Sequence, residues 1–171
     1  NKGQEDANHS RDFINIPIEV RKLADNVYQA RGVANTQVIT TSEGHVVYDT
    51  GLSTQAAKQR RLMNEALPEG PITHVVLSHS HQDHAGGTRF WVEDGTEIVT
   101  HREYPEEQRY LKELEDYFWA RNRMLFPFMP ETPPKTGIFA YGDVVPTILV
   151  DQPDIMRFEQ GGIRFEILPT P

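Results

Sequence analysis

One stretch of this 171-residue chain, Val75-Val-Leu-Ser-His-Ser-His-Gln-Asp-His-Ala-Gly-Gly87, decides how the rest is interpreted. The first residues of this stretch belong to an apolar run over residues 71–78, which starts at a Gly-Pro pair. Such a run is typical of a short buried strand. Residues two apart in an extended backbone point the same way. The pattern therefore predicts that His79 and His81 aim together from the carboxyl end of a strand.

A second pair of polar side chains follows at once. Asp83 and His84 come one turn later, where the chain bends, so they can face the same space from another wall. Gly86 and Gly87 are expected to let the backbone pass close to this site and to begin the next helix without a Cβ clash.

Imidazole nitrogens with a carboxylate suggest a metal site. They suit Zn²⁺, and also iron or manganese where the cell supplies them. Two ions about 3.5–4 Å apart could share a bridging water, lower its pKa towards about 7 and clamp the oxygens of a displacement reaction. The pattern thus predicts a hydrolytic centre; a structural metal site, or a polar loop that merely contains histidines, is the alternative. The chain has no cysteine, which excludes a thiolate zinc site.

The motif His79-Ser-His-Gln-Asp-His-Ala-Gly-Gly87 resembles the signature of the metallo-β-lactamase-fold superfamily. Asp49-Thr-Gly51, after a short apolar run, resembles an earlier Asp-x-Gly element of the same superfamily. The resemblance covers residues 18–101 well and the rest loosely. It implies an α/β (α+β) protein with an αββα sandwich and one or two metal ions. The chain would hold the amino-terminal half of that sandwich and the start of its second sheet.

The resemblance also implies roles for individual residues. His79 and His81 would bind one metal ion, and Asp83 and His84 would bind the other. Asp83 would in addition handle a proton during the reaction. Asp49 would lie behind the ligands and tie the floor of the site together.

The end of the sequence departs from the superfamily pattern. Members take further ligands from later in the chain: a histidine shortly after a Thr-Pro-Gly-like turn, a bridging aspartate and a final histidine. This sequence stops at residues 168–171, where the first of these would be about to appear, and no histidine follows His101. Four ligands shared by two ions leave each short of the three protein ligands expected of a catalytic zinc. We therefore expect a further carboxyl-terminal segment of a longer or cleaved protein to supply the missing ligands.

Composition sets the outer bounds. The length fits one domain, and the pattern divides it into a polar arm over residues 1–12 and a metallo-β-lactamase-like domain over residues 13–171. A formal net charge of −8 argues against a nucleic-acid partner. No apolar run approaches the length of about 18 residues that a membrane span needs. The absence of cysteine leaves the compartment open.

The remaining elements follow from local patterns. Alternation and turn residues predict strands at residues 14–20, 27–31, 37–41, 45–49, 97–100, 155–159 and 163–168. Helices are predicted at residues 54–67, with Ser53 as the N-cap, and at residues 85–92. The first helix is expected to bury one face made of Ala56, Met63, Ala66 and Leu67. His45 is expected at the surface, and His101 is expected to be structural rather than a ligand.

Residues 104–137 are predicted to form an insertion, a long helix over 104–125 followed by a proline-rich loop. Apolar residues recur every seven positions on this helix, in the rows Tyr110, Tyr117, Met124 and Leu111, Phe118, Leu125. We expect the insertion to fold over the mouth of the site. Its candidate substrate contacts, for an anionic and an apolar group respectively, are Arg121 and Arg123, and Phe126 and Phe128. A homodimer interface or ordinary core packing is the alternative.

The leading functional prediction is a metal-dependent hydrolase, with two zinc ions, that acts on an ester-, sulfate-ester- or amide-type small molecule. The stretch from Tyr28 to Gly32, Asn35 and residues 120–123 resemble the alkylsulfatase branch of the superfamily, which implies a sulfate ester with an apolar group. A mononuclear iron dioxygenase of the same fold is a second candidate. A non-catalytic binding module is a third, although such modules commonly lose the clustered ligands.

Overall fold

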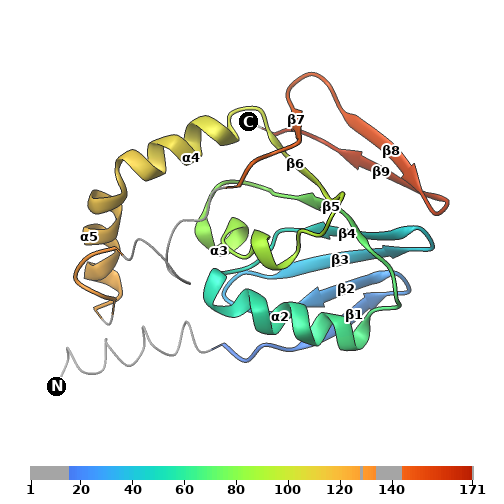
Figure 1. Cartoon of the computed structure of the whole chain (residues 1–171), viewed down its shortest axis with the longest axis horizontal. Coiled ribbons are helices and arrows are strands. Elements are labelled where there is room, and N and C mark those ends of the chain that lie inside the picture. Colours follow the sequence, from blue (N-terminus) through green and yellow to red (C-terminus); the bar gives the residue numbers. More distant parts are fainter. Residues whose placement is uncertain (1–15, 128, 134–143, 171) are drawn as a thin grey trace.

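The computed structural model describes residues 16–127, 129–133 and 144–170, and within them the strands form two sheets (Figure 1). The larger sheet has seven strands in sequence order: β1 (Val20–Ala24), β2 (Val27–Ala30), β3 (Thr36–Thr41), β4 (Gly44–Tyr48), β5 (Ile72–Val76), β6 (Glu97–His101) and β7 (Ile148–Val150). The smaller is an antiparallel hairpin of β8 (Met156–Gln160) and β9 (Ile163–Ile167). The helices are α2 (Ser53–Ala66), α3 (Gln82–Ala85), the short 3-10 helix η1 (Thr88–Phe90), α4 (Tyr104–Glu113) and α5 (Glu115–Leu125).

The large sheet changes from antiparallel to parallel at β4. Strands β1 to β4 form an antiparallel meander, whereas β4, β5, β6 and β7 run parallel. The chain returns through α2 between β4 and β5, as a parallel connection requires. Tyr48 pairs with Val76, so the carboxyl ends of β4 and β5 lie side by side. Open sheets of this kind bind ligands beyond the carboxyl ends of their parallel strands.

Alternation along the central strands divides the core between the two faces of the large sheet. Val47 and Val75 belong to a cluster on the helical face, with Val38, Met63, Leu77, Trp91 and Tyr104 among its members. Val46 and Val76 belong to a second cluster, which packs against residues of the small sheet, including Met156, Phe158, Phe165 and Ile167. Layers of helix, large sheet and small sheet result, which agrees with the predicted mixed α/β class.

Polar contacts fasten the small sheet to the large one. Gln160 is buried at 7% exposure, where its amide accepts a hydrogen bond from Thr73 at 2.8 Å and donates one to Thr41 at 3.1 Å. The backbone N–H of Gly161 donates to the Glu43 carboxylate at 2.9 Å. The turn of the predicted carboxyl-terminal hairpin is thereby held on the β3–β4 turn.

Several local predictions need correction. Residues 14 and 15 of the strand predicted over 14–20 lie outside the described residues, and from residue 16 onward the strand begins only at Val20, after Pro17, which has no N–H to pair. The first helix opens on the carbonyl of Leu52, which accepts from two backbone N–H groups, so Ser53 is its first residue and not its cap. Ala66 is exposed. The helix predicted over residues 85–92 is two short pieces, α3 and η1.

The environment of His45 is also different from the prediction. Its side chain is only 2% exposed, because β4 lies between β3 and β5 and the loop after α2 covers the start of the strand. The Nε2 atom lies 2.9 Å from the carbonyl oxygen of Pro68. An interior place in the sheet overrides the position of this residue at a strand start.

The single long helix predicted over residues 104–125 is wrong: the chain forms α4 and α5, which meet at Leu114 and run in different directions (Figure 1). The break places Glu115 and Asp116 in the first turn of a new helix, where acidic side chains are favourable. The predicted apolar row is largely uncovered in the described structure, since Tyr110, Tyr117 and Met124 are 52%, 62% and 82% exposed.

Two predictions concern other parts of the chain. The polar arm, residues 1–12, lies outside the described residues. Among the helices of the described residues, none has the length and apolar character needed to cross a membrane.

Candidate functional site

Asp49 is the first residue after β4, and its buried carboxylate lies at the centre of a hydrogen-bond network. It accepts from the backbone N–H of Ser78 at 2.8 Å, from the Ser78 hydroxyl at 2.8 Å and from Nδ1 of His84 at 2.7 Å. The Asp49 side chain is 5% exposed. Its backbone has φ 55°, a left-handed conformation that aspartate tolerates better than most residues. One side chain thus links the ends of β4 and β5 to α3.

His84 is held at both its ring and its backbone. Nδ1 donates to Asp49, and the carbonyl oxygen accepts from the N–H and the hydroxyl of Thr50 at 2.7 and 2.9 Å. This leaves Nε2 as the nitrogen for a further ligand. Nε2 lies 3.5 Å from the carboxylate of Asp83, whose side chain is 40% exposed. A histidine oriented through its second nitrogen by a carboxylate is the usual arrangement behind a metal ion.

The three histidines of the motif form a cluster of rings. The ring centroid of His79 lies 4.6 Å from that of His81 and 4.2 Å from that of His84. The predicted convergence of residues from the strand end and from the following turn therefore occurs. Burial lowers the pKa of His79, and the neighbouring His84 and His81 lower it further. The neutral imidazole, which is the form that binds metals, is favoured there.

The close approach predicted for the glycines is visible at Gly87. A Cβ added at this position would lie 2.1 Å from the carbonyl oxygen of Thr50. The N–H of Gly87 donates to the carbonyl of Gly51 at 3.0 Å. A side chain at this position would push the motif away from the Asp49 loop, so glycine is required by contact.

The donor groups fit a metal ion in kind, because imidazole and carboxylate are ligands for zinc, iron or manganese. They do not reach a full ligand set. Within residues 16–127, 129–133 and 144–170, no three His, Cys, Asp or Glu side chains are placed so that they could hold an ion between them. A metal ion at this position would need additional donors.

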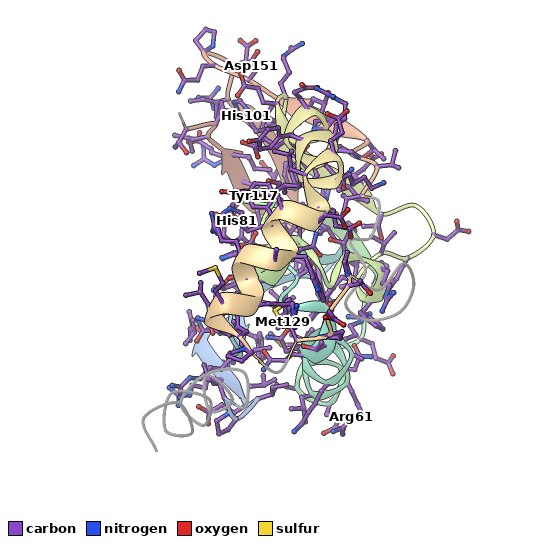
Figure 2. The ribbon with its side chains drawn as sticks, turned by 90° about the vertical axis from the view of Figure 1, so that its left-hand side faces the viewer. Arg61, His81, His101, Tyr117, Met129 and Asp151 are labelled. Carbon is purple, nitrogen blue, oxygen red and sulfur yellow. The ribbon has the colours of Figure 1, made fainter. Side chains whose placement is uncertain are left out.

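A cavity of about 200 Å³ lies at the same edge of the large sheet. Its lining includes Tyr48 and Ser78 from the ends of β4 and β5, His101 from the end of β6, and Leu168 to Thr170 after β9. His101 faces this cavity, with Nε2 3.9 Å from a carboxylate oxygen of Asp151. Figure 2 shows these two side chains together at one end of the molecule.

The predicted substrate contacts lie apart from the histidines. Arg121, Arg123 and Phe126 belong to α5 and its end, which stands to one side of α3 (Figure 1). The guanidinium of Arg121 lies 5.7 Å from the ring centroid of Phe118. The indole N–H of Trp119 donates to the carbonyl of Pro130 at 2.8 Å, which folds the proline-rich loop back on α5. Phe128 is outside the described residues.

Sequence reasoning missed two polar residues, Ser78 directly before the motif and Ser80 within it. Ser78 contacts Asp49, as described above, and its hydroxyl also lies 2.9 Å from Nδ1 of His79. Ser80, between the first two histidines, donates from its hydroxyl to the Glu107 carboxylate at 2.9 Å. The alternation of serine with histidine was a visible signal for Ser80, but nothing local identified Glu107.

The chain belongs to the metallo-beta-lactamase superfamily, whose family model matches residues 30–171. Over 71 residues, 40% of this chain and 11% of the relative, it is 35% identical to an alkyl/aryl-sulfatase of Saccharomyces cerevisiae. The chain therefore matches only about a tenth of that curated relative.

Solved structures share the fold. The stereoselective inverting sec-alkylsulfatase of a Pseudomonas species superposes with a TM-score of 0.67 at 22% identity, over 88% of this chain and 27% of that one. A subclass B3 metallo-beta-lactamase of Bradyrhizobium japonicum superposes with a TM-score of 0.63 at 20% identity, over 95% of this chain and 55% of that one. These likenesses agree with the resemblance noted from the sequence motif.

Proposed function

We propose that this chain carries the metal-binding half of the active site of a metal-dependent hydrolase. The observation that supports it most is the joining of Asp49 to Nδ1 of His84 at 2.7 Å beside the clustered rings of His79 and His81. Membership of the metallo-beta-lactamase superfamily also supports a metal-dependent hydrolase. A simple polar loop has no need of a buried carboxylate that orients one histidine toward two others.

The proposed ligand pairs are His79 with His81 and Asp83 with His84. When bound, the metal supplies Lewis acidity and lowers the pKa of water towards about 7. Asp49 holds the Nδ1 proton of His84, so that Nε2 carries the lone pair. Asp83, 40% exposed, is accessible to take a proton from the reacting water.

We favour zinc and two ions, with iron or manganese as the alternatives. Two ligands for each ion fall short of the three expected of a catalytic zinc site. The additional ligands would come from outside the described residues. The need for additional ligands follows from the coordination number of catalytic zinc.

For the substrate, we propose a sulfate ester with an apolar alkyl or aryl group. Support comes from the yeast relative, named an alkyl/aryl-sulfatase, and from an alkylsulfatase among the structures with the same fold. Arg121 and Arg123 could meet the sulfate and Phe126 the apolar group, provided that α5 approaches the histidines when substrate binds. The same α5 face could instead pair with a second copy of the chain.

The test is elemental analysis of the protein as the cell makes it, followed by assays with a long-chain alkyl sulfate and with a β-lactam. We expect two zinc ions per chain and release of sulfate. The variants His81→Ala and Asp83→Ala should lose metal and turnover while they keep their fold. His74→Phe, which changes a histidine that contacts the small sheet, is the matched control and should keep its metal.

Other results would refute this proposal. One iron per chain with oxygen consumption would indicate a dioxygenase. A protein without metal would indicate a binding module. Release of sulfate by His81→Ala at the normal rate would remove the motif from the reaction.

A further inference from the structure

The loop that carries the first two histidines is held from both sides by serines. His79 and His81 project to the site, whereas Ser78 and Ser80, at the alternating positions, bond to the body of the protein. Ser80 is 7% exposed, and its hydroxyl donates to the Glu107 carboxylate at 2.9 Å. The rear of the loop therefore rests on a charged acceptor from another element.

Glu107 lies in the first turn of α4, and this turn is fixed to the protein at two further points. Tyr104 is 3% exposed and packs in the core on the helical face. The side-chain amide of Gln108 donates to the backbone carbonyl of Val144 at 3.0 Å and accepts from its N–H at 2.9 Å. The Glu107 carboxylate is thus presented by a helix start that has little freedom to move.

We propose that Glu107 is a positioning residue which, through Ser80, fixes the loop bearing His79 and His81 and so sets the affinity of the site for its metal ion. The inference rests on the proposed function, because it requires that these histidines bind metal. It adds a residue of α4 to the arrangement that the motif and Asp49 provide. It also links the α4–α5 segment mechanically to the ligand loop.

The direction of the effect follows from the contact. Removal of the Glu107 carboxylate leaves the buried hydroxyl of Ser80 without its acceptor, and the loop must shift or admit water to satisfy it. The two histidines then lose part of their preset geometry. Residues that orient metal ligands from behind change metal affinity by about 10–100-fold when they are removed.

The experiment measures Zn²⁺ affinity by competition with a chromophoric chelator, in the whole protein as the cell makes it. Ser80→Ala and Glu107→Ala should each weaken Zn²⁺ binding by about 10–100-fold. Glu107→Gln keeps an acceptor oxygen and should recover most of the affinity. Glu106→Ala is the matched control. It removes the same charge one residue before Glu107, and the carboxylate of Glu106 accepts from Arg109 and not from Ser80. Thermal unfolding of each metal-free variant verifies the fold.

A double variant tests the direct link. If Ser80 and Glu107 act through one hydrogen bond, Ser80→Ala/Glu107→Ala should bind Zn²⁺ no more weakly than the worse single variant. Losses that simply add would overturn the proposal, as would wild-type affinity in Ser80→Ala. If the unaltered protein binds no divalent metal, the proposed function fails and this inference fails with it. Tight binding by the unaltered protein and all variants overturns the inference alone.

Discussion

The substitution Asp49→Asn separates the role of Asp49 in orienting His84 from its role in folding. Asparagine has nearly the same shape and, like aspartate, tolerates the left-handed backbone at φ 55°. Its oxygen can still accept from the Ser78 N–H, and the Ser78 hydroxyl can turn to Nδ1 of His79, 2.9 Å away. The altered contact is therefore the 2.7 Å bond to His84.

At that contact the variant presents an amide N–H₂ to Nδ1 of His84. The imidazole must then carry its proton on Nε2, where a metal ion would otherwise bind. A charge-assisted hydrogen bond contributes about 1.5–3 kcal/mol and a neutral one about 0.5–1.5 kcal/mol, so the metal-free protein should lose about 1–2 kcal/mol of unfolding free energy. Metal affinity should fall by about 10–100-fold.

Three measurements check this prediction. Urea unfolding of the metal-free protein gives the change in free energy, and a zinc titration gives the affinity. Long-range ¹⁵N–¹H spectra identify the protonated nitrogen of His84. Asp25→Asn, in the exposed turn after β1, makes the same change of charge and should alter neither quantity. Wild-type zinc affinity in Asp49→Asn, with the proton still on Nδ1, would refute the reasoning.

Three further predictions concern the fold. Met63→Ala removes a side chain with 0% exposure and should lower the free energy of urea unfolding by about 2–5 kcal/mol. Met124→Ala, at 82% exposure, should change it by less than about 0.5 kcal/mol, and equal effects of the two variants would contradict the placement of Met63 in the core. Gly161→Ala would bring a Cβ within 2.8 Å of the Ser42 backbone nitrogen, while Gly162→Ala, also at positive φ, meets open space, so the melting temperature should fall further for the first variant. His74 stacks on Phe158 at 4.3 Å between ring centroids, and burial lowers its pKa. As the pH falls through about 6.5, the unfolded chain therefore binds a proton before the folded protein does, and the free energy of unfolding decreases. His74→Phe should flatten the decrease in unfolding free energy between about pH 7 and pH 5, and an unchanged slope would contradict this assignment.

Patterns within a few residues of one another predicted much of the structure correctly. The strand before the histidines and the carboxyl-terminal hairpin follow from a two-residue period. The ring centroids of His79 and His81 lie 4.6 Å apart, in agreement with the predicted shared direction. The motif alone indicated the family, which the family model confirms over residues 30–171. Local signals worked here because backbone geometry at these positions fixes where each side chain points.

Predictions that depended on distant neighbours were less reliable. His45 is buried because two strands and a loop enclose it, and no local pattern shows that enclosure. The long helix divides at Leu114, although the seven-residue apolar rows continue through the break. Arg121 and Arg123 remain predicted substrate contacts, and they belong to α5, which lies to one side of α3 (Figure 1).

The sequence by itself determined which groups could perform the chemistry: three imidazoles and a carboxylate at the end of one strand, with a second aspartate after an earlier strand. Only the tertiary structure decided how they are held. The parallel register of β4 and β5 brings Asp49 to His84 across 35 positions of sequence, and the anchored start of α4 brings Glu107 to Ser80 across 27. Side-chain direction along a strand is set by local backbone geometry, whereas these contacts arise only once the sheet has paired and the core has packed.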